Sequence, residues 1–431
     1  MSEAKIIINC SFCRKPSTDV KKVIAGPDDI YICDECIDLC YEEAHKTDKD
    51  RKRVVEADPV AAEEKKLPKP SEINEHLRSF IIGQEDALKA ISVAVYDHYK
   101  RLRNPIVDDV ELEKSNILLV GPTGSGKTLI AKSIAKMLDV PFAIADATAL
   151  TEAGYVGDDV ESIITRLLQA AENDVAKAER GIIYLDEIDK KARRGETASG
   201  SRDVSGEGVQ QALLKIIEGT EVMVPSQGGR KGPNHDLVKI NTRNILFVLG
   251  GAFVNIEKLV EKDLNKTSSI GFGASQIGRQ KDDLNTLFSK IEADHLTKYG
   301  LIPELVGRLP VICVLHELTE DQLIRVMTET KNAVTRQFEK LFQLDGVALE
   351  FDLAAIRVIA KIAQERKTGA RGLRSVIEKH LLQTKFDLPT LSEKGLAKVV
   401  VSASSDGTKL ETNLVYNAVI EPAPMLAIAN S

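Results

Sequence analysis

Residues 116–128 read NILLVGPTGSGKT, an apolar run that leads into a glycine-rich loop and the start of a helical pattern. The loop at residues 121–128 fits the pattern G-x-x-x-x-G-K-[ST], and it has the strand before it and the helix after it that this motif requires. Its glycines allow backbone N–H groups to turn inward around phosphate oxygens at a helix amino terminus, where anions are favoured. This stretch therefore predicts a nucleotide site.

The nucleotide would be held by consecutive residues of the loop. Lys127 would reach the β- and γ-phosphates, and the hydroxyl of Thr128 would ligate Mg²⁺. The residues expected to bind ATP here are Gly121, Pro122, Thr123, Gly124, Ser125, Gly126, Lys127, Thr128 and Leu129.

A pair of adjacent acids follows some fifty residues later. Residues 181–189 read GIIYLDEID, an apolar run that ends in Asp186 and Glu187. Asp186, at the carboxyl end of the expected strand, would hold the magnesium directly or through water, and Glu187 would orient and polarise the attacking water. An acid pair beside a phosphate loop predicts hydrolysis of the nucleotide and not binding alone.

Strand-like and helix-like patterns alternate through the middle of the chain. In order, they cover residues 116–120, 127–138, 141–147, 159–178, 181–185, 208–218 and 244–250, of which the second, fourth and sixth are helical. Short all-apolar strands that alternate with helices indicate a parallel sheet covered on both faces. We therefore expect an α/β fold.

The pattern changes after about residue 315. Helical patterns cover residues 319–341, 353–365 and 372–386, the last with a stop at Pro389, and the only strand candidate is 398–402. This predicts a smaller, mostly helical domain. The expected boundaries are a zinc-binding domain at 1–46, a flexible linker at 47–70, a large ATPase domain at 71–316, the small domain at 317–418 and a disordered tail at 419–431.

Four cysteines near the amino terminus have metal-ligand spacing. Cys10, Cys13, Cys33 and Cys36 form C-x₂-C-x₁₉-C-x₂-C. Two such knuckles bring four thiolates into a tetrahedron, which suits structural Zn²⁺ and leaves no open position for catalysis. Cys40 is read as a packing residue, with a ligand role as the less favoured alternative. The single later cysteine, Cys313, lies in an apolar run and is expected in the core.

The overall composition excludes several classes of protein. The chain has 431 residues, 43% hydrophobic and 29% charged, with a net charge of −7. Its longest apolar stretch, residues 245–254, is ten residues long, well short of the roughly 20 that a membrane span needs. The first residues lack the apolar core of a secretory signal. A membrane protein, an exported protein and a basic nucleic-acid coat are therefore disfavoured, and a cytoplasmic location is expected.

Further motifs produce a specific resemblance. The phosphate loop and acid pair, with GRLP around Arg308 and GARGLR around Arg371, resemble the AAA+ ATPases. The cysteine-rich head narrows this to the Clp-type protein unfoldases, which feed the ClpP peptidase, and three segments agree: GYVGDDVES at 154–162, RDVSGEGVQQALLKIIEGT at 202–220 and IGFGA at 270–274. The resemblance runs from about Cys10 to about Ser402.

The resemblance implies roles for individual residues. From the sequence alone, Arg308 and Arg371 are candidates for stabilising charge in the transition state. In the family, Arg308 matches an arginine finger offered to a neighbouring subunit's ATP, which implies a ring, usually a homohexamer. Arg371 matches the sensor-2 arginine, which acts within its own subunit. Ile81 and Ile82 match residues that line the adenine pocket.

Other matches concern the protein substrate and the peptidase. Tyr155 and Val156 match a loop that grips the polypeptide in the central channel, where an aromatic and a branched side chain between glycines contact many sequences. Arg230 and Lys231 match the channel mouth, which captures tagged proteins. The residues that match the loop docking onto ClpP are Ile270, Gly271 and Phe272. The family's zinc head also receives adaptor proteins.

The chain departs from the family pattern in two places. Arg230 and Lys231 are followed by Gly232, where the family usually has histidine, so a histidine contribution to tag capture is in doubt. Gly250 and Gly251 stand where many AAA+ proteins carry a polar sensor-1 residue, and no residue is assigned to that role.

Two other functions remain as alternatives. A nucleic-acid remodelling ATPase with a zinc module would predict a basic stripe and base-stacking aromatic residues. The net charge of −7 and the 4% aromatic content argue against it, so no nucleic acid is expected as a direct ligand. The second alternative is a chaperone that works without ClpP. Deletion of residues 270–272, with unfolding and proteolysis assayed separately, would distinguish it from an unfoldase coupled to the peptidase.

Overall fold

The computed structural model describes residues 9–27, 30–45, 66–104, 106–107, 110–151, 158–193, 206–225, 237–267 and 284–417. The chain divides into two compact units, Met1–Lys66 and Leu67–Ser431. The expected tail and nearly all of the expected linker lie outside the described residues.

The first unit is a small cysteine-rich module. Strands β1 (Val23–Ala25) and β2 (Tyr31–Cys33) form an antiparallel hairpin, and helix α1 (Asp34–His45) follows directly. Cys33 ends β2 and Cys36 lies in the first turn of α1, so the second pair of cysteines spans the junction between strand and helix.

A five-stranded parallel sheet forms the centre of the second unit. In spatial order its strands are β13 (Val311–Val314), β5 (Ile117–Val120), β12 (Leu246–Gly251), β9 (Ile182–Asp186) and β6 (Phe142–Asp146). The expected parallel sheet is confirmed. Because these strands are parallel, the carboxyl ends of β5, β9 and β12 lie at the same edge of the sheet. Ligands bind at this edge in open α/β sheets.

Alternate residues of the strands enter two separate cores. Ile117 and Leu119 of β5 pack on one face, whereas Leu118 and Val120 pack on the other. The first face is covered by α3 (Pro70–Arg78), α4 (Glu85–Arg103) and α5 (Lys127–Leu138). The second core takes residues from α6 (Ser162–Ala170), α8 (Glu207–Glu218), α9 (Ile256–Thr267), α10 (Leu284–Ser289), α11 (Ala293–Tyr299) and α12 (Pro303–Gly307). Both faces are therefore buried, as the all-apolar strands predict.

Three short strand pairs extend this part of the unit. They are β3 (Ile106–Val107) with β4 (Val110–Glu111), β7 (Leu150–Thr151) with β8 (Asp158–Asp159), and β10 (Glu221–Pro225) with β11 (Leu237–Asn241). The β7 and β8 strands flank the segment that holds Tyr155, and β10 and β11 flank the segment that holds Arg230.

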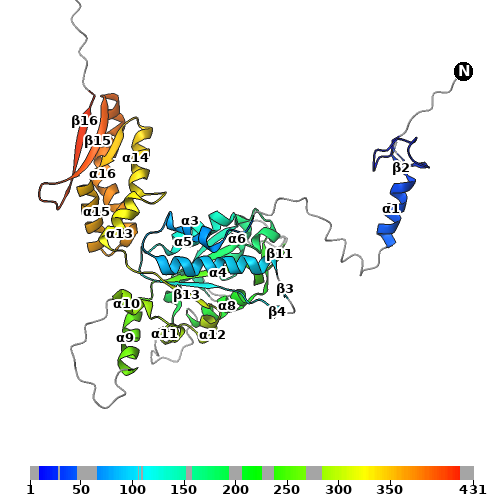
Figure 1. Cartoon of the computed structure of the whole chain (residues 1–431), viewed down its shortest axis with the longest axis horizontal. Helices are drawn as coiled ribbons and strands as arrows, with labels where there is room; N and C mark the ends of the chain where they lie inside the picture. Colours follow the sequence, from blue (N-terminus) through cyan, green and yellow to red (C-terminus); the bar gives the residue numbers. More distant parts are fainter. Residues whose placement is uncertain are drawn as a thin grey trace, which may run out of the picture. The chain divides into compact units, whose positions relative to one another are not determined.

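The C-terminal elements have a core of their own. They are α13 (Glu320–Thr328), α14 (Val334–Leu344), β14 (Ala348–Phe351), α15 (Leu353–Glu365), α16 (Gly369–Glu393), β15 (Leu396–Ala403) and β16 (Leu410–Tyr416). Figure 1 shows them, in yellow to red, gathered as one group, and their buried residues form a separate cluster. The predicted helical C-terminal region is confirmed, and it carries a three-stranded sheet in the order β14-β15-β16.

The structure corrects four local predictions. The helix expected at 159–178 is broken into α6 and α7 (Val175–Ala178), because Glu172 and Asn173 adopt positive φ angles and the Asp174 side chain caps α7. The helix expected at 319–341 is likewise two helices, α13 and α14.

The other two corrections lie further along. Pro389 does not stop its helix: α16 continues to Glu393, and Leu388 beside the proline is buried in the C-terminal core. The strand expected at 398–402 is joined by β14 and β16, which were not predicted.

Candidate functional site

The loop between β5 and α5 is shaped by its glycines. Gly124 and Gly126 have φ angles of +82° and +101°, a region that L side chains rarely adopt. Gly121 lies against the residue that follows β13: an added Cβ would be 2.5 Å from the Leu315 carbonyl oxygen. Three positions of the motif are therefore fixed by backbone geometry, independently of any ligand.

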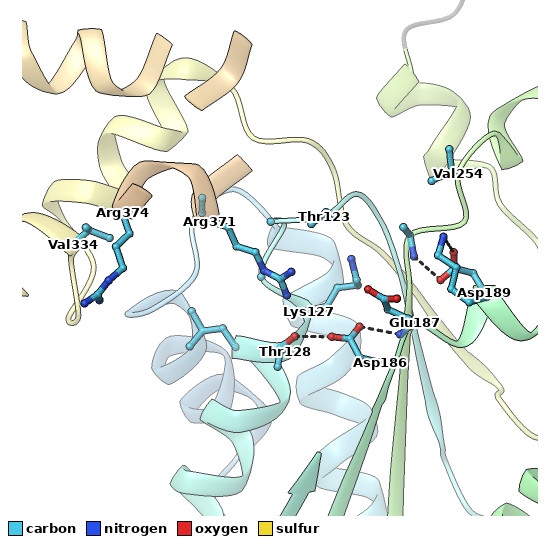
Figure 2. A pocket seen from close by; sticks show the side chains of 16 residues that line it. Thr123, Lys127, Thr128, Asp186, Glu187, Asp189, Val254, Val334, Arg371 and Arg374 are labelled. Carbon is cyan, nitrogen blue, oxygen red and sulfur yellow. Dashed lines mark hydrogen bonds and ion pairs between the residues drawn. The ribbon is translucent and has the colours of Figure 1, made fainter. Parts of the chain in front are cut away.

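A cavity of about 510 Å³ opens at this loop, a size typical of small-ligand sites. Its lining residues are Thr123, Gly124, Gly126, Lys127, Thr128, Leu129, Asp186, Glu187, Asp189, Lys190, Ala252, Val254, Val334, Ala370, Arg371 and Arg374. Figure 2 shows residues of β9, α5 and α16 converging on it. The structure thus brings the loop, the acid pair and Arg371 together, although they are far apart in sequence.

Asp186 is held through both carboxylate oxygens. Its Oδ2 accepts a hydrogen bond from the Thr128 hydroxyl at 3.1 Å. Its Oδ1 accepts from the Tyr184 hydroxyl and from the Glu187 backbone N–H, each at 3.0 Å. Thr128 and Asp186, the two residues expected to hold magnesium, therefore offer neighbouring oxygen atoms, the ligand type that Mg²⁺ prefers.

Glu187 follows Asp186 on a tight backbone turn. Its φ of 58° is a left-handed conformation that few non-glycine residues adopt. This turn ends β9 and leaves the carboxylate exposed at the cavity (Figure 2). Residues held in such conformations cluster at active sites, and this position suits a group that orients water.

Lys127 is buried at the base of the loop. Its Nζ donates hydrogen bonds to the carbonyl oxygens of Gly121 at 2.7 Å and Pro122 at 2.9 Å. Burial lowers the pKa of Lys127, whereas the charges of Asp186 and Asp189 act in the opposite direction. The ammonium group is therefore held against the backbone of the loop, near the carboxylates of Asp186 and Asp189.

Two arginines reach the cavity from α16. In Figure 2, Arg371 extends toward Lys127 and Thr128, while Arg374 points away alongside Val334. Arg374 donates to the Gln337 side chain at 2.8 Å and lies over the Phe338 ring. The first turn of α16 also touches the loop directly, since the Ala370 N–H donates to the Gly124 carbonyl at 3.3 Å. The C-terminal elements thus complete the cavity.

Arg308 does not lie in this cavity. It follows α12 and precedes β13, at the amino end of the sheet, and lines a separate cavity of about 370 Å³. Its Nε donates to Glu218 at 2.8 Å, and its carbonyl accepts from the Asn116 side chain at 3.0 Å. Because the phosphate loop lies at the carboxyl edge of the sheet, Arg308 is placed away from the nucleotide cavity of its own chain.

Several other predicted ATP contacts lie behind the cavity wall. Ile81 and Ile82 are buried, and an added Cβ at Gly126 would be 3.4 Å from the Ile81 side chain. The Ser125 hydroxyl donates to the Pro122 carbonyl at 2.8 Å, inside the loop. Ile81 therefore packs against the loop, and Ile82 is buried. The residues expected to bind ATP that do not line the cavity are Ile81, Ile82, Gly121, Pro122 and Ser125.

Sequence reasoning missed three residues of the site. Asp189 accepts a hydrogen bond from the Ala252 N–H at 3.1 Å and so ties the acid pair to the end of β12. Tyr184 contacts Asp186, and Arg374 lines the cavity beside Arg371. Asp189 lies three residues after Asp186, and Arg374 lies three residues after Arg371. Their closeness in sequence to two predicted site residues was the available signal. Nothing in the sequence pattern indicated Tyr184.

The four cysteines of the first unit form a compact cluster. The sulfur atoms of Cys10, Cys13, Cys33 and Cys36 all lie within 4.8 Å of one another. The Cys10–Cys36 and Cys13–Cys33 separations are 3.9 and 3.6 Å, and a tetrahedral Zn²⁺ with bonds of about 2.3 Å places its sulfurs about 3.8 Å apart. The donor set therefore fits zinc. Cys40 is exposed and outside the cluster, and Cys313 is buried in the core.

The predicted contacts to protein partners fall on segments outside the described residues. These are Tyr155 and Val156, Arg230 and Lys231, and Ile270, Gly271 and Phe272. In the part of the chain that is described, no helix is both long and apolar enough to cross a membrane.

Comparison with known proteins gives concordant matches along the chain. Residues 8–43 match the ClpX C4-type zinc finger, residues 112–312 the AAA domain (Cdc48 subfamily), and residues 318–399 the C-terminal, D2-small domain of ClpB protein. The chain is 51% identical over 401 residues to the "ATP-dependent Clp protease ATP-binding subunit ClpX" of Treponema denticola, covering 92% of this chain and 94% of that protein.

Proposed function

Since this chain belongs to the ClpX family of AAA+ ATP-binding Clp protease subunits, we propose that it uses ATP to pull tagged proteins through a ring and delivers them to the ClpP peptidase. It is an ATPase and unfoldase and not itself a peptidase. Its zinc module binds structural Zn²⁺ through the four clustered cysteines.

The observation that carries the proposal is the convergence of five side chains on one cavity. They are Lys127, Thr128, Asp186, Glu187 and Arg371. Lys127 would exchange its carbonyl partners for phosphate oxygens, and Arg371 would bind the phosphates from the C-terminal side. Mg²⁺, held by Thr128 and Asp186, would neutralise phosphate charge. Glu187, exposed on its strained turn, would accept a proton from the attacking water.

The position of Arg308 favours a ring of identical subunits. This arginine lines a different cavity, at the opposite end of the sheet from the nucleotide cavity of its own chain. Its Nε donates to Glu218, and about half of its side chain, 53%, is exposed. Within a homohexamer, Arg308 would reach the ATP of the neighbouring subunit and stabilise transition-state charge there. A cytoplasmic location belongs to the same proposal, as do the domain boundaries at 46, 70, 316 and 418.

Three segments would act on protein partners. Tyr155 and Val156 would grip the substrate in the channel, Arg230 and Lys231 would attract its tag, and Ile270–Phe272 would dock ClpP. Short apolar anchors on separate loops suit docking between rings, since each loop adapts independently. The zinc module would receive adaptors.

The direct test is ATP-dependent degradation of a folded, tagged reporter with and without ClpP. We expect degradation only when ATP, the chain and ClpP are all present. Without ClpP, we expect unfolding without cleavage, which is the chaperone activity. Deletion of residues 270–272 should abolish degradation and spare unfolding. A reporter degraded equally well by the deletion variant would exclude this docking site.

A further inference from the structure

Tyr184 and Gly250 form a matched pair beside the acid pair. Tyr184 and Asp186 lie two residues apart on β9, so they face the same side of the sheet. On the adjacent strand β12, Val248 pairs with Tyr184 and Leu249 with Leu185, which places Gly250 next to Asp186. The tyrosine side chain therefore lies along the strand boundary, with its hydroxyl 3.0 Å from Asp186 Oδ1.

The phenol occupies the space that a side chain at position 250 would need. An added Cβ at Gly250 would collide with the Tyr184 hydroxyl and would lie 2.9 Å from its Cζ. Because Gly250 on β12 has no side chain, the Tyr184 hydroxyl from β9 can occupy this space. This accounts for Gly250 in physical terms, which the sequence could not do.

The Tyr184 hydroxyl is placed to donate a hydrogen bond to the carboxylate. Its side chain is fully buried, and its hydroxyl donates to Asp186 Oδ1 at 3.0 Å. The Thr128 hydroxyl and the Glu187 N–H are the other donors to Asp186. Three donors to one carboxylate restrict its rotation, so that its lone pairs keep a fixed direction.

We propose that Tyr184 is a positioning residue for the magnesium-bound nucleotide: its hydroxyl, admitted by Gly250, holds Asp186 in the orientation that receives the metal. This inference rests on the proposed role of Asp186 in the ATPase. Tyr184 does not line the cavity, so it would act through its hydrogen bond to Asp186. It supplies from β9 a polar group next to Gly250, a position where β12 has no side chain.

The test measures ATP binding against Mg²⁺ concentration in the full chain carrying Glu187→Gln, so that hydrolysis does not interfere. Tyr184→Phe in this background removes one oxygen atom and keeps the ring. We expect about a tenfold rise in the Mg²⁺ concentration that gives half-maximal ATP affinity, as loss of a hydrogen bond to a charged group implies. ATP affinity in excess chelator should be unchanged.

The matched control is Tyr99→Phe. The Tyr99 hydroxyl is also buried and donates to the Arg180 carbonyl at 3.1 Å, but it lies outside the site. Its loss should leave the Mg²⁺ dependence unchanged. If Tyr184→Phe behaves like Tyr99→Phe, or weakens ATP binding equally with and without Mg²⁺, the positioning role is wrong.

Two further variants separate the possible failures. Asp186→Asn should raise the Mg²⁺ requirement at least as much as Tyr184→Phe; if it has no effect, the proposed role of Asp186 fails first. Gly250→Ala keeps the hydroxyl but displaces it, so it should shift the Mg²⁺ dependence in the same direction. Thermal melting of each apo-protein establishes that it is folded, and an unchanged Mg²⁺ dependence in folded Gly250→Ala also contradicts the proposal.

Discussion

At the scale of single residues, the adjacent carboxylates Asp186 and Glu187 have different proposed roles in the site. Asp186 is half-buried and bound by three donors, whereas Glu187 is exposed on a left-handed turn. A restrained carboxylate suits metal binding, and an accessible carboxylate suits contact with water. The two neighbours therefore have different environments that match their proposed roles.

Replacing Glu187 tests this division. Glu187→Gln should retain ATP affinity within about threefold and lower kcat for hydrolysis by at least about a hundredfold, because general-base catalysis contributes roughly 10²–10⁴-fold. Steady-state phosphate release and equilibrium ATP binding measure the two quantities. Glu172→Gln, an exposed carboxylate between α6 and α7, is the control and should change neither. Near-normal turnover in Glu187→Gln would remove this residue from the mechanism.

The local motifs of the site were predictable, and the contacts between strands were not. The phosphate loop and acid pair are contiguous in sequence, and each carries its chemistry in a short pattern. Tyr184 reads as one more apolar strand residue until the neighbouring strand supplies Gly250 as its partner. Likewise, the distance between Arg308 and the cavity depends on which end of the sheet each occupies, which spacing along the chain does not reveal.

At the scale of elements, strongly apolar strands were predicted well and weakly patterned elements were not. Strands β5, β9 and β12 are buried on both faces, so their sequences are continuous apolar runs. By contrast, β16 reads LETNLVY and is mostly exposed, so it gives little hydrophobic signal. Its place is determined by pairing with β15. Pro389 is a second case in which local sequence misleads. Proline usually ends a helix, but α16 continues past it because the helix is packed in the C-terminal core.

The zinc module provides a prediction at this scale. Cys13→Ser should abolish zinc binding and unfold residues 9–45, because so small a module derives much of its folding free energy from the metal. The measurement is zinc content per chain, combined with amide hydrogen exchange. Cys40→Ser, which changes an exposed cysteine outside the cluster, should retain one zinc ion per chain.

The second unit should be unaffected by this change. It is a separate compact unit with its own cores, so its melting temperature and basal ATPase rate should be the same in Cys13→Ser and the wild type. Loss of zinc from Cys40→Ser, or full zinc occupancy in Cys13→Ser, would contradict the four-cysteine assignment.

At the scale of the whole molecule, the placement of Arg308 and Arg371 predicts that a neighbouring subunit can replace the first arginine but not the second. Subunits with Lys127→Ala lack a working nucleotide site but keep their own Arg308. In a mixture with Arg308→Ala subunits, the Lys127→Ala subunits should supply Arg308 to the intact nucleotide sites of their Arg308→Ala neighbours. ATPase activity of the mixture should therefore rise several-fold above the sum of the two variants measured separately.

The matched mixture uses Arg371→Ala in place of Arg308→Ala. Arg371 lines the cavity of its own chain, so a neighbouring subunit cannot replace it, and this mixture should show no gain. Equal gains in both mixtures, or a gain in neither while mixed rings form, would show that Arg308 does not act between subunits.

The central claim is that hydrolysis of ATP in this chain unfolds proteins. The most direct measurement is the loss of native fluorescence of a stable, tagged reporter in the presence of a trap that retains unfolded protein, with no peptidase added. The account predicts ATP-dependent loss of fluorescence with the wild type and none with Glu187→Gln. A wild-type ring that hydrolyses ATP yet leaves the tagged reporter folded would contradict it.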